Sequence, residues 1–293
     1  MKNNQREPGK FPFGIYERTS LKQTPKAAAI IGAAILLWTM ISGCAAGPDI
    51  ISSDPEIYCI QTGFTNSYLI KAKDGYLLID TSYYKEYDNF TDSLRNLGLE
   101  LNDISYILLT HHHDDHSGFA ARLVKNTDAR LIVYKDSAAF LEQGTYSLEE
   151  KPLNVCVRFI IGAYGMFHEF TYPPVPVRDV GYIVAGDDAD LLKQIGIDGE
   201  IIHTPGHTND SITVVLKDGK AFVGDAAMDL LNICMCEHRP IYINSEIKTF
   251  ESWQKMKEHG ARIIYSAHGS PFPIENLMEV ANKRHFISET TED

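Results

Sequence analysis

The amino-acid sequence predicts a mixed α/β fold from residue 56 onward, and three observations support this prediction. Short apolar runs of the kind that form buried strands recur along the chain and end at polar residues. Stretches with the helical spacing of apolar residues separate several of these runs. Hydrophobic residues make up 44% of the 293 residues, which is enough to fill a sizeable core.

Each expected element follows from its local pattern. Short apolar runs predict strands at residues 57–61, 67–72, 76–80, 104–110 and 131–134, with further runs at 201–202, 221–223 and 263–265. Lys73, Asp74 and Gly75 are expected to form the hairpin turn between the second and third strands. Apolar residues spaced along one face predict helices at residues 84–97 (ended by Gly98), 118–123, 137–143 and 250–259.

A cluster of metal-ligand side chains directly follows the expected strand at 104–110. The residues are His111-His112-His113-Asp114-Asp115-His116, which fit the pattern His-x-His-x-Asp-His. Imidazole nitrogens and carboxylate oxygens are ligands that zinc accepts. After a buried strand, such a cluster indicates a rigid loop at the edge of a sheet.

Four further polar residues stand at the ends of short apolar runs. Asp80 closes the run Leu77-Leu78-Ile79, and His207 lies in Thr204-Pro205-Gly206-His207-Thr208. Asp225 follows Phe222-Val223-Gly224, and His268 follows Ser266-Ala267. Their order along the chain, together with the histidine cluster, forms a highly specific combination of motifs.

These motifs resemble those of the metallo-β-lactamase superfamily over residues 56–275. The resemblance implies one catalytic domain with an αββα sandwich, in which two mixed β-sheets pack face to face and helices flank them. It also implies a metal site at one edge of the sheets. Residues 276–293 are then expected to form a C-terminal helix or tail.

The resemblance further implies a dinuclear centre. One metal would take His111, His113 and His207, the other Asp115, His116 and His268, with Asp225 bridging both. A bridging hydroxide would attack the substrate, and Asp115 would carry a proton to the leaving group, so Asp115 and Asp225 are the expected catalytic residues. Two divalent ions are expected. Zinc is preferred to iron or manganese as their identity, because iron-dependent relatives tend to have Glu where His113 stands.

Other residues near the motifs have supporting roles or none. Asp80 is expected to accept the free N–H of a ligand imidazole and so fix its tautomer. His112 occupies the variable position of the motif and is expected to point away from the metals. His203 could support the site or simply pack in the core. The histidines without a motif, for which a surface or core position is expected, are His168, His238, His259 and His285.

The substrate is narrowed by departures from named subfamilies. Zinc β-lactamases lack the bridging aspartate, so Asp225 weighs against antibiotic hydrolysis. Acyl-homoserine lactonases carry a Tyr shortly after that aspartate, which here only Tyr242 or Tyr265 could replace. Glyoxalase II usually has a basic C-terminal region, whereas this C-terminus is acidic. The expected reaction is hydrolysis of an ester, lactone, thioester or related bond of a small molecule. The alternatives are a lipoprotein that only binds metal or ligand, and an iron-dependent oxidoreductase or sulfur dioxygenase.

The N-terminus predicts export. Residues 1–26 contain six Lys or Arg and two Glu, a net charge of +4, and residues 27–41 are apolar. This stretch is shorter than the ~20 residues that span a membrane. Ile41-Ser42-Gly43-Cys44 is similar to a bacterial lipobox, so we expect a signal peptide at 1–43, a lipidated Cys44 and a tether at 44–55. An uncleaved N-terminal anchor is the alternative, and both place the catalytic domain outside the cytoplasm at the cell membrane.

Charge and the remaining cysteines add further limits. The chain has a net charge of −12, and removal of residues 1–43 would leave −16, which argues against nucleic acid as a partner.

The cysteines that remain are Cys59, Cys156, Cys234 and Cys236, which allow three disulfide pairings, while the last two could instead bind metal.

Two segments are candidates for the walls of a substrate pocket. Residues 145–180 are rich in aromatic residues and proline, although an aromatic helix packed on the core is equally compatible with this composition. Residues 230–244, which contain Arg239 and Tyr242, form a second candidate lid just after Asp225.

Overall fold

The computed structural model describes residues 48–53, 56–147, 149–166, 168, 170–177 and 181–290. The expected signal peptide and Cys44 lie outside these ranges. Among the residues that are described, no helix combines the length and the apolar character needed to cross a membrane.

The first sheet has seven strands. In spatial order they are β1 (Asp49–Ser53), β2 (Glu56–Thr62), β3 (Thr65–Ala72), β4 (Gly75–Ile79), β5 (Ile104–Leu108), β6 (Arg130–Tyr134) and β8 (Gly181–Val184). Strands β1 to β4 pair antiparallel, whereas β4, β5, β6 and β8 pair parallel. The sheet is therefore mixed. The hairpin between β3 and β4 forms at the predicted turn, where Gly75 adopts a φ of 111°.

The second sheet has five strands. Their spatial order is β14 (Phe272–Pro273), β13 (Ile263–Ser266), β11 (Lys220–Gly224), β10 (Ile212–Leu216) and β9 (Gly199–His203). Only β11 and β13 pair parallel; the other neighbours are antiparallel. This sheet is also mixed, as the sequence predicts.

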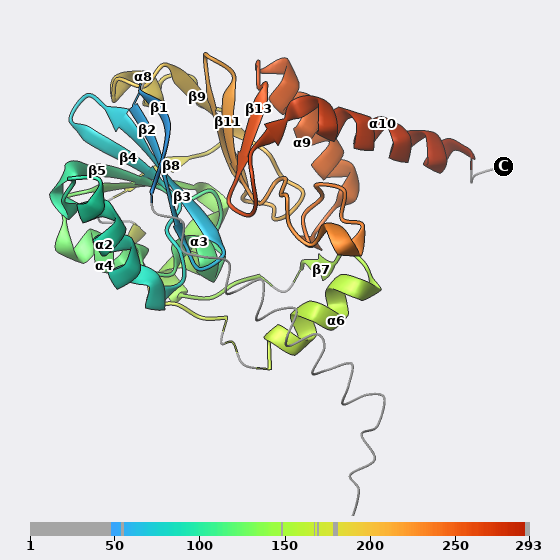
Figure 1. Cartoon of the computed structure of the whole chain (residues 1–293), viewed down its shortest axis with the longest axis horizontal. Coiled ribbons are helices and arrows are strands. Elements are labelled where there is room, and N and C mark those ends of the chain that lie inside the picture. Colours follow the sequence, from blue (N-terminus) through green and yellow to red (C-terminus); the bar gives the residue numbers. More distant parts are fainter. Residues whose placement is uncertain are drawn as a thin grey trace, which may run out of the picture.

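The two sheets pack face to face over one apolar core, and helices cover their outer faces (Figure 1). Between the sheets, Ile70 and Leu108 of the first sheet lie in one cluster with Val214 of the second. Outside the first sheet, a second cluster includes residues of α2 (Tyr87–Asn96) and α4 (Ala120–Asn126). Outside the second sheet, a third includes residues of α9 (Glu246–Glu258) and α10 (Ile274–Thr290). The predicted αββα sandwich is confirmed.

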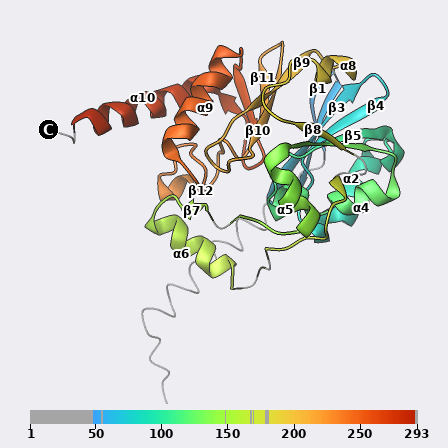
Figure 2. The same ribbon diagram turned by 180° about the vertical axis from the view of Figure 1, so that it is seen from behind.

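A smaller substructure lies beside the sandwich, where Figures 1 and 2 show α6 next to β7. It consists of α6 (Val155–Tyr164), the 3-10 helix η4 (Asn232–Cys234), and a two-stranded ribbon of β7 (Lys151–Pro152) and β12 (Tyr242–Ile243). The ribbon joins the two segments that the sequence proposes as pocket walls. The other short helices are η1 (Tyr84–Glu86), η2 (Leu101–Asp103), η3 (Lys135–Ser137), α5 (Ala138–Gln143) and α8 (Leu191–Gln194).

The structure selects one of the possible disulfide pairings. Cys156 of α6 is bonded to Cys234 of η4, while Cys59 and Cys236 are free. The bond crosses a small apolar cluster that contains Val157 and Leu231. Because Cys234 is consumed by this bond, the pair Cys234-x-Cys236 is not a metal site.

We expect this disulfide to hold α6 against the rest of the molecule. Replacing Cys156 and Cys234 together by Ser should lower the free energy of unfolding by about 2–4 kcal/mol, because the crosslink restricts the unfolded chain. In this double variant, protection from hydrogen exchange should fall more in α6 than in β5, relative to the unaltered protein. The free-cysteine variant Cys59→Ala provides the control. Unchanged protection of α6 in the double variant would contradict this role.

One local prediction is wrong, and a second is confirmed except for the residue at which the helix begins. Residues 49–53, part of the expected tether, form the edge strand β1, which pairs with β2. The helix expected to open at residue 118 is instead preceded by α3 (Asp114–Ser117), and α4 begins at Ala120. Consequently, Asp115 and His116 lie on a helical turn rather than on an extended loop.

Candidate metal centre

The seven expected ligands meet at one edge of the sandwich. His111 and His113 follow β5, Asp115 and His116 lie on α3, and the loops after β9, β11 and β13 carry His207, Asp225 and His268. Strands β4 and β5 run parallel, as do β11 and β13. The carboxyl ends of parallel strands lie at the same edge of a sheet, which is where open α/β sheets bind ligands. This topology explains why residues far apart in the sequence converge.

Three imidazoles form the first group of ligand atoms. The Nε2 atom of His207 lies 3.2 Å from Nε2 of His111 and 3.1 Å from Nδ1 of His113. Burial lowers the pKa of His111 and His113 well below the ordinary value, and the neighbouring imidazoles lower it further, so both rings are neutral.

Hydrogen bonds aim the lone pairs of this group at one another. His207 donates its Nδ1–H to the carbonyl oxygen of Tyr242 at 2.7 Å, which leaves Nε2 as a bare acceptor. Thr110 Oγ1 lies 2.8 Å from the Asp80 carboxylate, to which it donates, and it accepts from Nδ1 of His111 at 3.1 Å. Facing lone pairs repel one another unless a cation lies between them, so this group fits a metal ion.

A second group consists of Asp115, His116 and His268, whose ligand atoms lie within 4.8 Å of one another. The Nε2 atom of His268 is 3.2 Å from Oδ2 of Asp115. His268 donates its Nδ1–H to the carbonyl oxygen of Phe64 at 2.8 Å, so its Nε2 faces the group. Although burial disfavours the charged ring, Asp225 and Asp115 raise the pKa of His268 to about 9.

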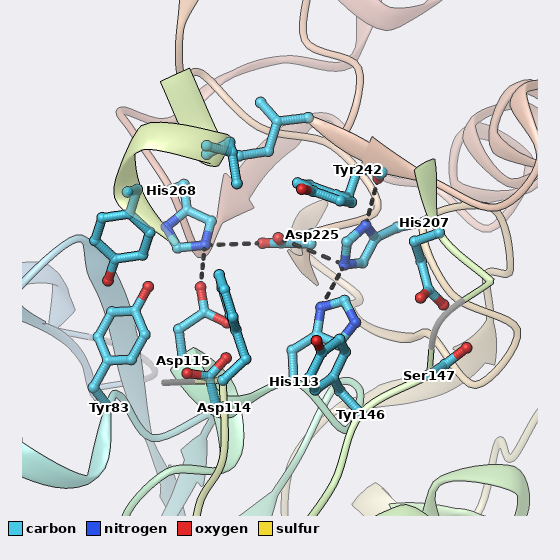
Figure 3. Close-up of a pocket in the computed structure, with 15 residues that line it drawn as sticks. Tyr83, His113, Asp114, Asp115, Tyr146, Ser147, His207, Asp225, Tyr242 and His268 are labelled. Carbon is cyan, nitrogen blue, oxygen red and sulfur yellow. Dashed lines mark hydrogen bonds and ion pairs between the residues drawn. The ribbon is translucent and has the colours of Figure 1, made fainter. Parts of the chain in front are cut away.

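Asp225 lies between the two groups, with His268 on one side and His207 on the other (Figure 3). Its Oδ1 is 3.3 Å from Nε2 of both His116 and His268, and its Oδ2 is 3.7 Å from Nε2 of His207. Despite its burial, the imidazoles of His268 and His116 hold the pKa of this carboxyl below its usual range. Asp225 therefore has the position that a bridging carboxylate requires.

Two atoms of this centre are buried and have no hydrogen-bond partner. They are Nε2 of His116 and Oδ1 of Asp225. Buried polar atoms without a partner are rare in folded proteins because their desolvation is uncompensated. A divalent cation between them would satisfy both atoms, so the donor set fits the metals that the sequence predicts.

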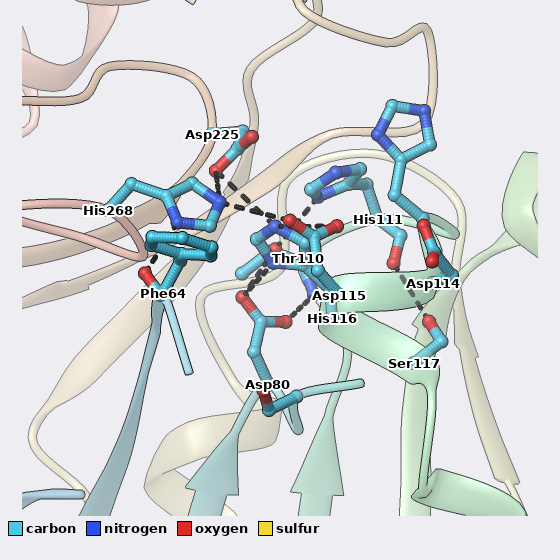
Figure 4. A network of polar contacts seen from close by, with 12 residues as sticks. Phe64, Asp80, Thr110, His111, Asp114, Asp115, His116, Ser117, Asp225 and His268 are labelled. Carbon is cyan, nitrogen blue, oxygen red and sulfur yellow. Dashed lines mark hydrogen bonds and ion pairs between the residues drawn. The ribbon is translucent and has the colours of Figure 1, made fainter. Parts of the chain in front are cut away.

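Asp80 fixes the orientation of His116 from below the centre (Figure 4). Its carboxylate accepts Nδ1–H of His116 at 2.8 Å and the backbone N–H and hydroxyl of Thr110 at 2.7 and 2.8 Å. Asp80 itself has a φ of 58°, a left-handed conformation that Asp tolerates better than most residues. These contacts have the geometry that its expected role requires.

Close approach of β11 to β5 depends on a glycine beside Asp225. Gly224 has a φ of 53°, and a Cβ atom there would lie 2.2 Å from Oγ1 of Thr110. Only glycine allows the backbone before Asp225 to pass so near the Thr110–Asp80 contact.

A cavity of about 270 Å³ opens onto the metal centre (Figure 3). Five of the seven expected ligands line it, namely His113, Asp115, His207, Asp225 and His268. The remaining lining residues come from the loop after β4, from α3, and from both segments proposed as pocket walls: Tyr83, Asp114, Tyr146, Ser147, Glu150, Ile161, Tyr164, Phe170, Ile241 and Tyr242.

The wall segments differ in detail from the sequence predictions. Tyr242 lines the cavity, but Arg239 does not: its guanidinium is buried against Glu246 and the carbonyl oxygens of Met235 and Cys236. Tyr265 stacks on Phe222 between the sheets and cannot reach the substrate. Of the two tyrosines considered as replacements for the lactonase tyrosine, only Tyr242 remains.

His112 points away from the metals, as its place in the motif predicts. It donates Nδ1–H to the buried carboxylate of Asp210 at 2.9 Å, and its Nε2 accepts the backbone N–H of Ser147 at 2.9 Å. The metal loop is thereby tied to the pocket wall. His203 packs flat against Tyr134, with ring centroids 4.3 Å apart, so it lies outside the centre.

Sequence reasoning missed a second contact between the metal loop and the wall. His168, for which no role was expected, lies 2.7 Å from Oδ2 of Asp114 through its Nε2 and 3.0 Å from the hydroxyl of Tyr164 through its Nδ1. The ring of His168 also contacts that of Tyr83 at 4.9 Å. No motif marks these residues, because they meet only through the tertiary fold.

Comparison with known proteins agrees with the fold and identifies the family. A family model described as the metallo-β-lactamase superfamily matches residues 60–268. An atrochrysone carboxyl ACP thioesterase of Aspergillus aculeatus is 26% identical over 217 residues, covering 73% of this chain and 53% of that protein. The β-lactamase-like protein 2 homologue of Drosophila melanogaster is 24% identical over 242 residues, covering 80% of this chain and 69% of that protein. The chain thus spans about half the length of the fungal relatives that it matches.

Solved structures give the same result for the fold. A B3 metallo-β-lactamase with an active-site glutamic acid superposes with a TM-score of 0.59 at 20% identity, covering 87% of this chain and 96% of that one. The metallo-β-lactamase SMB-1 superposes with a TM-score of 0.58 at 18% identity, covering 85% and 98%. At these identities the likeness concerns the fold alone. Since the family match extends over more than half of the chain, this protein belongs to the metallo-β-lactamase superfamily.

Proposed function

We propose that the protein is a metal-dependent hydrolase that holds two divalent ions, with zinc as the favoured metal. The observation that carries the proposal is the arrangement around Asp225, where two groups of ligand atoms face each other and His116 Nε2 and Asp225 Oδ1 are buried without partners. A structural zinc site normally has four protein ligands and no open position. Here the cavity reaches the ligand atoms directly, which favours turnover over mere binding.

Different residues of the chain would hold the metal ions and transfer the proton. When bound, two zinc ions would polarise the scissile carbonyl and make a water molecule acidic enough to act as the nucleophile near neutral pH. His111, His113 and His207 would hold one ion, and Asp115, His116 and His268 the other, with Asp225 shared. Asp115 also lines the cavity, so its carboxylate is placed to take up the proton and pass it to the leaving group.

The bond cleaved is proposed to be an acyl bond of a small molecule, such as an ester, lactone or thioester. A thioester is the first choice, because several matched relatives are named as thioesterases. The cavity volume of about 270 Å³ suits a small acyl group near the metals rather than a polymer.

Export to the cell surface as a lipoprotein is also proposed. It is supported by the similarity of Ile41-Ser42-Gly43-Cys44 to a lipobox and by the Cys156–Cys234 disulfide, since disulfides persist in oxidising compartments. We expect Cys44→Ala to abolish labelling by palmitate in a bacterial host and to leave the precursor uncleaved. Labelling of this variant at the level of the unaltered protein would contradict the proposal.

The function is tested with zinc-loaded protein comprising residues 45–293 and a panel of a thioester, a lactone, a β-lactam and a phosphodiester. Hydrolysis of the thioester or lactone that a chelator abolishes, and that added zinc restores, is the expected result. Zinc-loaded protein that cleaves none of them would overturn the proposed hydrolase, and iron-dependent oxidation of a thiol substrate would replace it by an oxidoreductase.

A further inference from the structure

Aromatic rings form much of the cavity lining that does not belong to the metal centre. They come from η1 and its neighbours, from the segment around α6, and from β12, and are Tyr83, Tyr146, Tyr164, Phe170 and Tyr242. Neighbouring rings touch: the centroids of Tyr146 and Phe170 are 5.8 Å apart, and those of Tyr164 and Phe170 are 6.3 Å apart. Aromatic rings bury flat apolar groups, and they attract a cation that lies over the ring face.

Outside the metal centre, the charged side chains that line the cavity have one sign. Apart from the histidines, the acidic and basic residues of the lining are all Asp or Glu, and among the described residues no Lys or Arg lines the cavity. Asp115 and Asp225 belong to the metal centre, and Asp114 is bound by His168. Glu150 is therefore the lining carboxylate that neither the metal centre nor His168 engages.

The basic side chains closest to Glu150 in the sequence do not offset it. Lys151 is exposed on β7, and Arg158 is exposed on α6; neither lines the cavity. The backbone of Glu150 stays close to the cavity because the β7–β12 ribbon places Lys151 opposite Ile243, next to Tyr242.

This distribution of charge should make binding depend on the charge of the substrate group that lies in the aromatic part of the cavity, away from the scissile bond. Away from the metal ions, a negative group beside this wall would find no Lys or Arg among the described lining residues to pair with, and Glu150 would repel it, which is costly. An uncharged aromatic group would bury its surface without that cost. A positive group would gain from Glu150 and from the ring faces. The net charge of −12 acts in the same direction at longer range.

We propose that the site selects acyl substrates whose part beyond the scissile bond is apolar or aromatic and not negatively charged, with a cationic group preferred, and that Glu150 sets this preference. The proposal rests on the proposed hydrolase function for its bond chemistry. The charge preference itself is a property of the cavity and can be measured by binding alone.

The test uses three thioesters of 2-phenylethanethiol that differ only in the para substituent of the ring: trimethylammonium, its uncharged isostere tert-butyl, and sulfonate. The two methylene groups separate the ring from the sulfur, so the three thiols have similar intrinsic reactivity as leaving groups. With zinc-loaded protein, kcat/KM should favour trimethylammonium over tert-butyl by about 5-fold and disfavour sulfonate by about 10-fold. Glu150→Gln should bring the first ratio within about 2-fold of unity, and Glu150→Lys should invert the order of the charged pair. Equal turnover of sulfonate and tert-butyl thioesters, or an order that Glu150→Lys leaves unchanged, would overturn the proposal.

Glu149→Gln is the matched control. Glu149 precedes Glu150 but does not line the cavity, and its carboxylate instead accepts from Asn209 and Asn244 at 2.9 and 3.1 Å. This variant changes the net charge equally and should keep the substrate order of the unaltered protein. Loss of the order here as well would show a non-specific charge effect and contradict the role of Glu150.

A binding measurement separates the two proposals. Calorimetry with phenyltrimethylammonium and benzenesulfonate on zinc-loaded protein should show that Glu150→Lys weakens binding of the cation and strengthens binding of the anion relative to the unaltered protein. If no member of the hydrolysis panel is cleaved, the hydrolase proposal fails, while this comparison still decides the charge preference. Turnover of the thioesters with no preference for the cation, together with binding that Glu150→Lys does not change, would leave the hydrolase proposal intact and refute the inference about substrate class.

Discussion

Asp225→Ala should lower kcat/KM for the best substrate by at least about 10²–10³-fold while the protein stays folded. Asp225 has oxygens that face both groups of ligand atoms, with Oδ1 near His116 and His268 and Oδ2 near His207. Its removal separates the two metal positions and leaves the imidazoles without a shared counter-charge. Bound zinc should therefore fall from two ions per chain toward one, as measured by elemental analysis of protein dialysed against a fixed free zinc concentration.

A control variant separates this effect from a general loss of charge. Asp198→Asn removes a carboxylate that is 68% exposed and pairs only with Lys217 at the surface. It should change neither zinc content nor turnover, because exposed ion pairs contribute little. Full activity and two bound zinc ions in Asp225→Ala would contradict the shared role of this carboxylate.

Asp80→Asn should weaken zinc binding and activity by about 10–100-fold, the range found when a partner of a ligand histidine is lost. The amide can still adopt the left-handed backbone conformation, so the fold is retained. It cannot, however, accept three donors as a carboxylate does, and Nδ1 of His116 loses its anionic partner. Zinc affinity measured against a competing chelator reports this loss separately from turnover.

Asp80→Ala extends the same test to stability. The backbone N–H and hydroxyl of Thr110 and the ring of His116 would all lose their acceptor in a buried site, which should cost about 2–4 kcal/mol of unfolding free energy. Asp92→Asn, at a carboxylate that is 72% exposed, is the control. Equal zinc affinity in Asp80→Asn and the unaltered protein would show that the Asp80 carboxylate does not strengthen zinc binding.

The metal centre was accessible from the sequence because its residues sit where strands end. His207, Asp225 and His268 each follow a short apolar run, and the carboxyl ends of β9, β11 and β13 share one edge of the sheet. Asp80 and the histidine cluster follow β4 and β5 in the same way, so the ends of these two strands supply the other residues of the centre. For such residues, the local pattern and the topology specify the same place.

Other features depend on contacts that no local pattern encodes. The edge strand β1 is short and partly polar, and pairing with β2 alone makes it a strand. The ribbon of β7 and β12 has two residues on each side and joins segments about 90 residues apart, so its register is a tertiary property. The same holds for the Cys156–Cys234 bond and for the contact of His168 with Asp114. By contrast, β10 (Ile212–Leu216) consists of β-branched and aliphatic residues with Thr213 as the one polar member, so a local strand pattern is present there.

The most direct test of the central claim is anomalous diffraction from crystals of the zinc-loaded protein, recorded on both sides of the zinc absorption edge. We expect two peaks of anomalous difference density, one among His111, His113 and His207 and the other among Asp115, His116 and His268, with Asp225 between them. A single peak enclosed by four protein ligands, or no peak at this edge of the sheets, would contradict a dinuclear centre built from these seven residues.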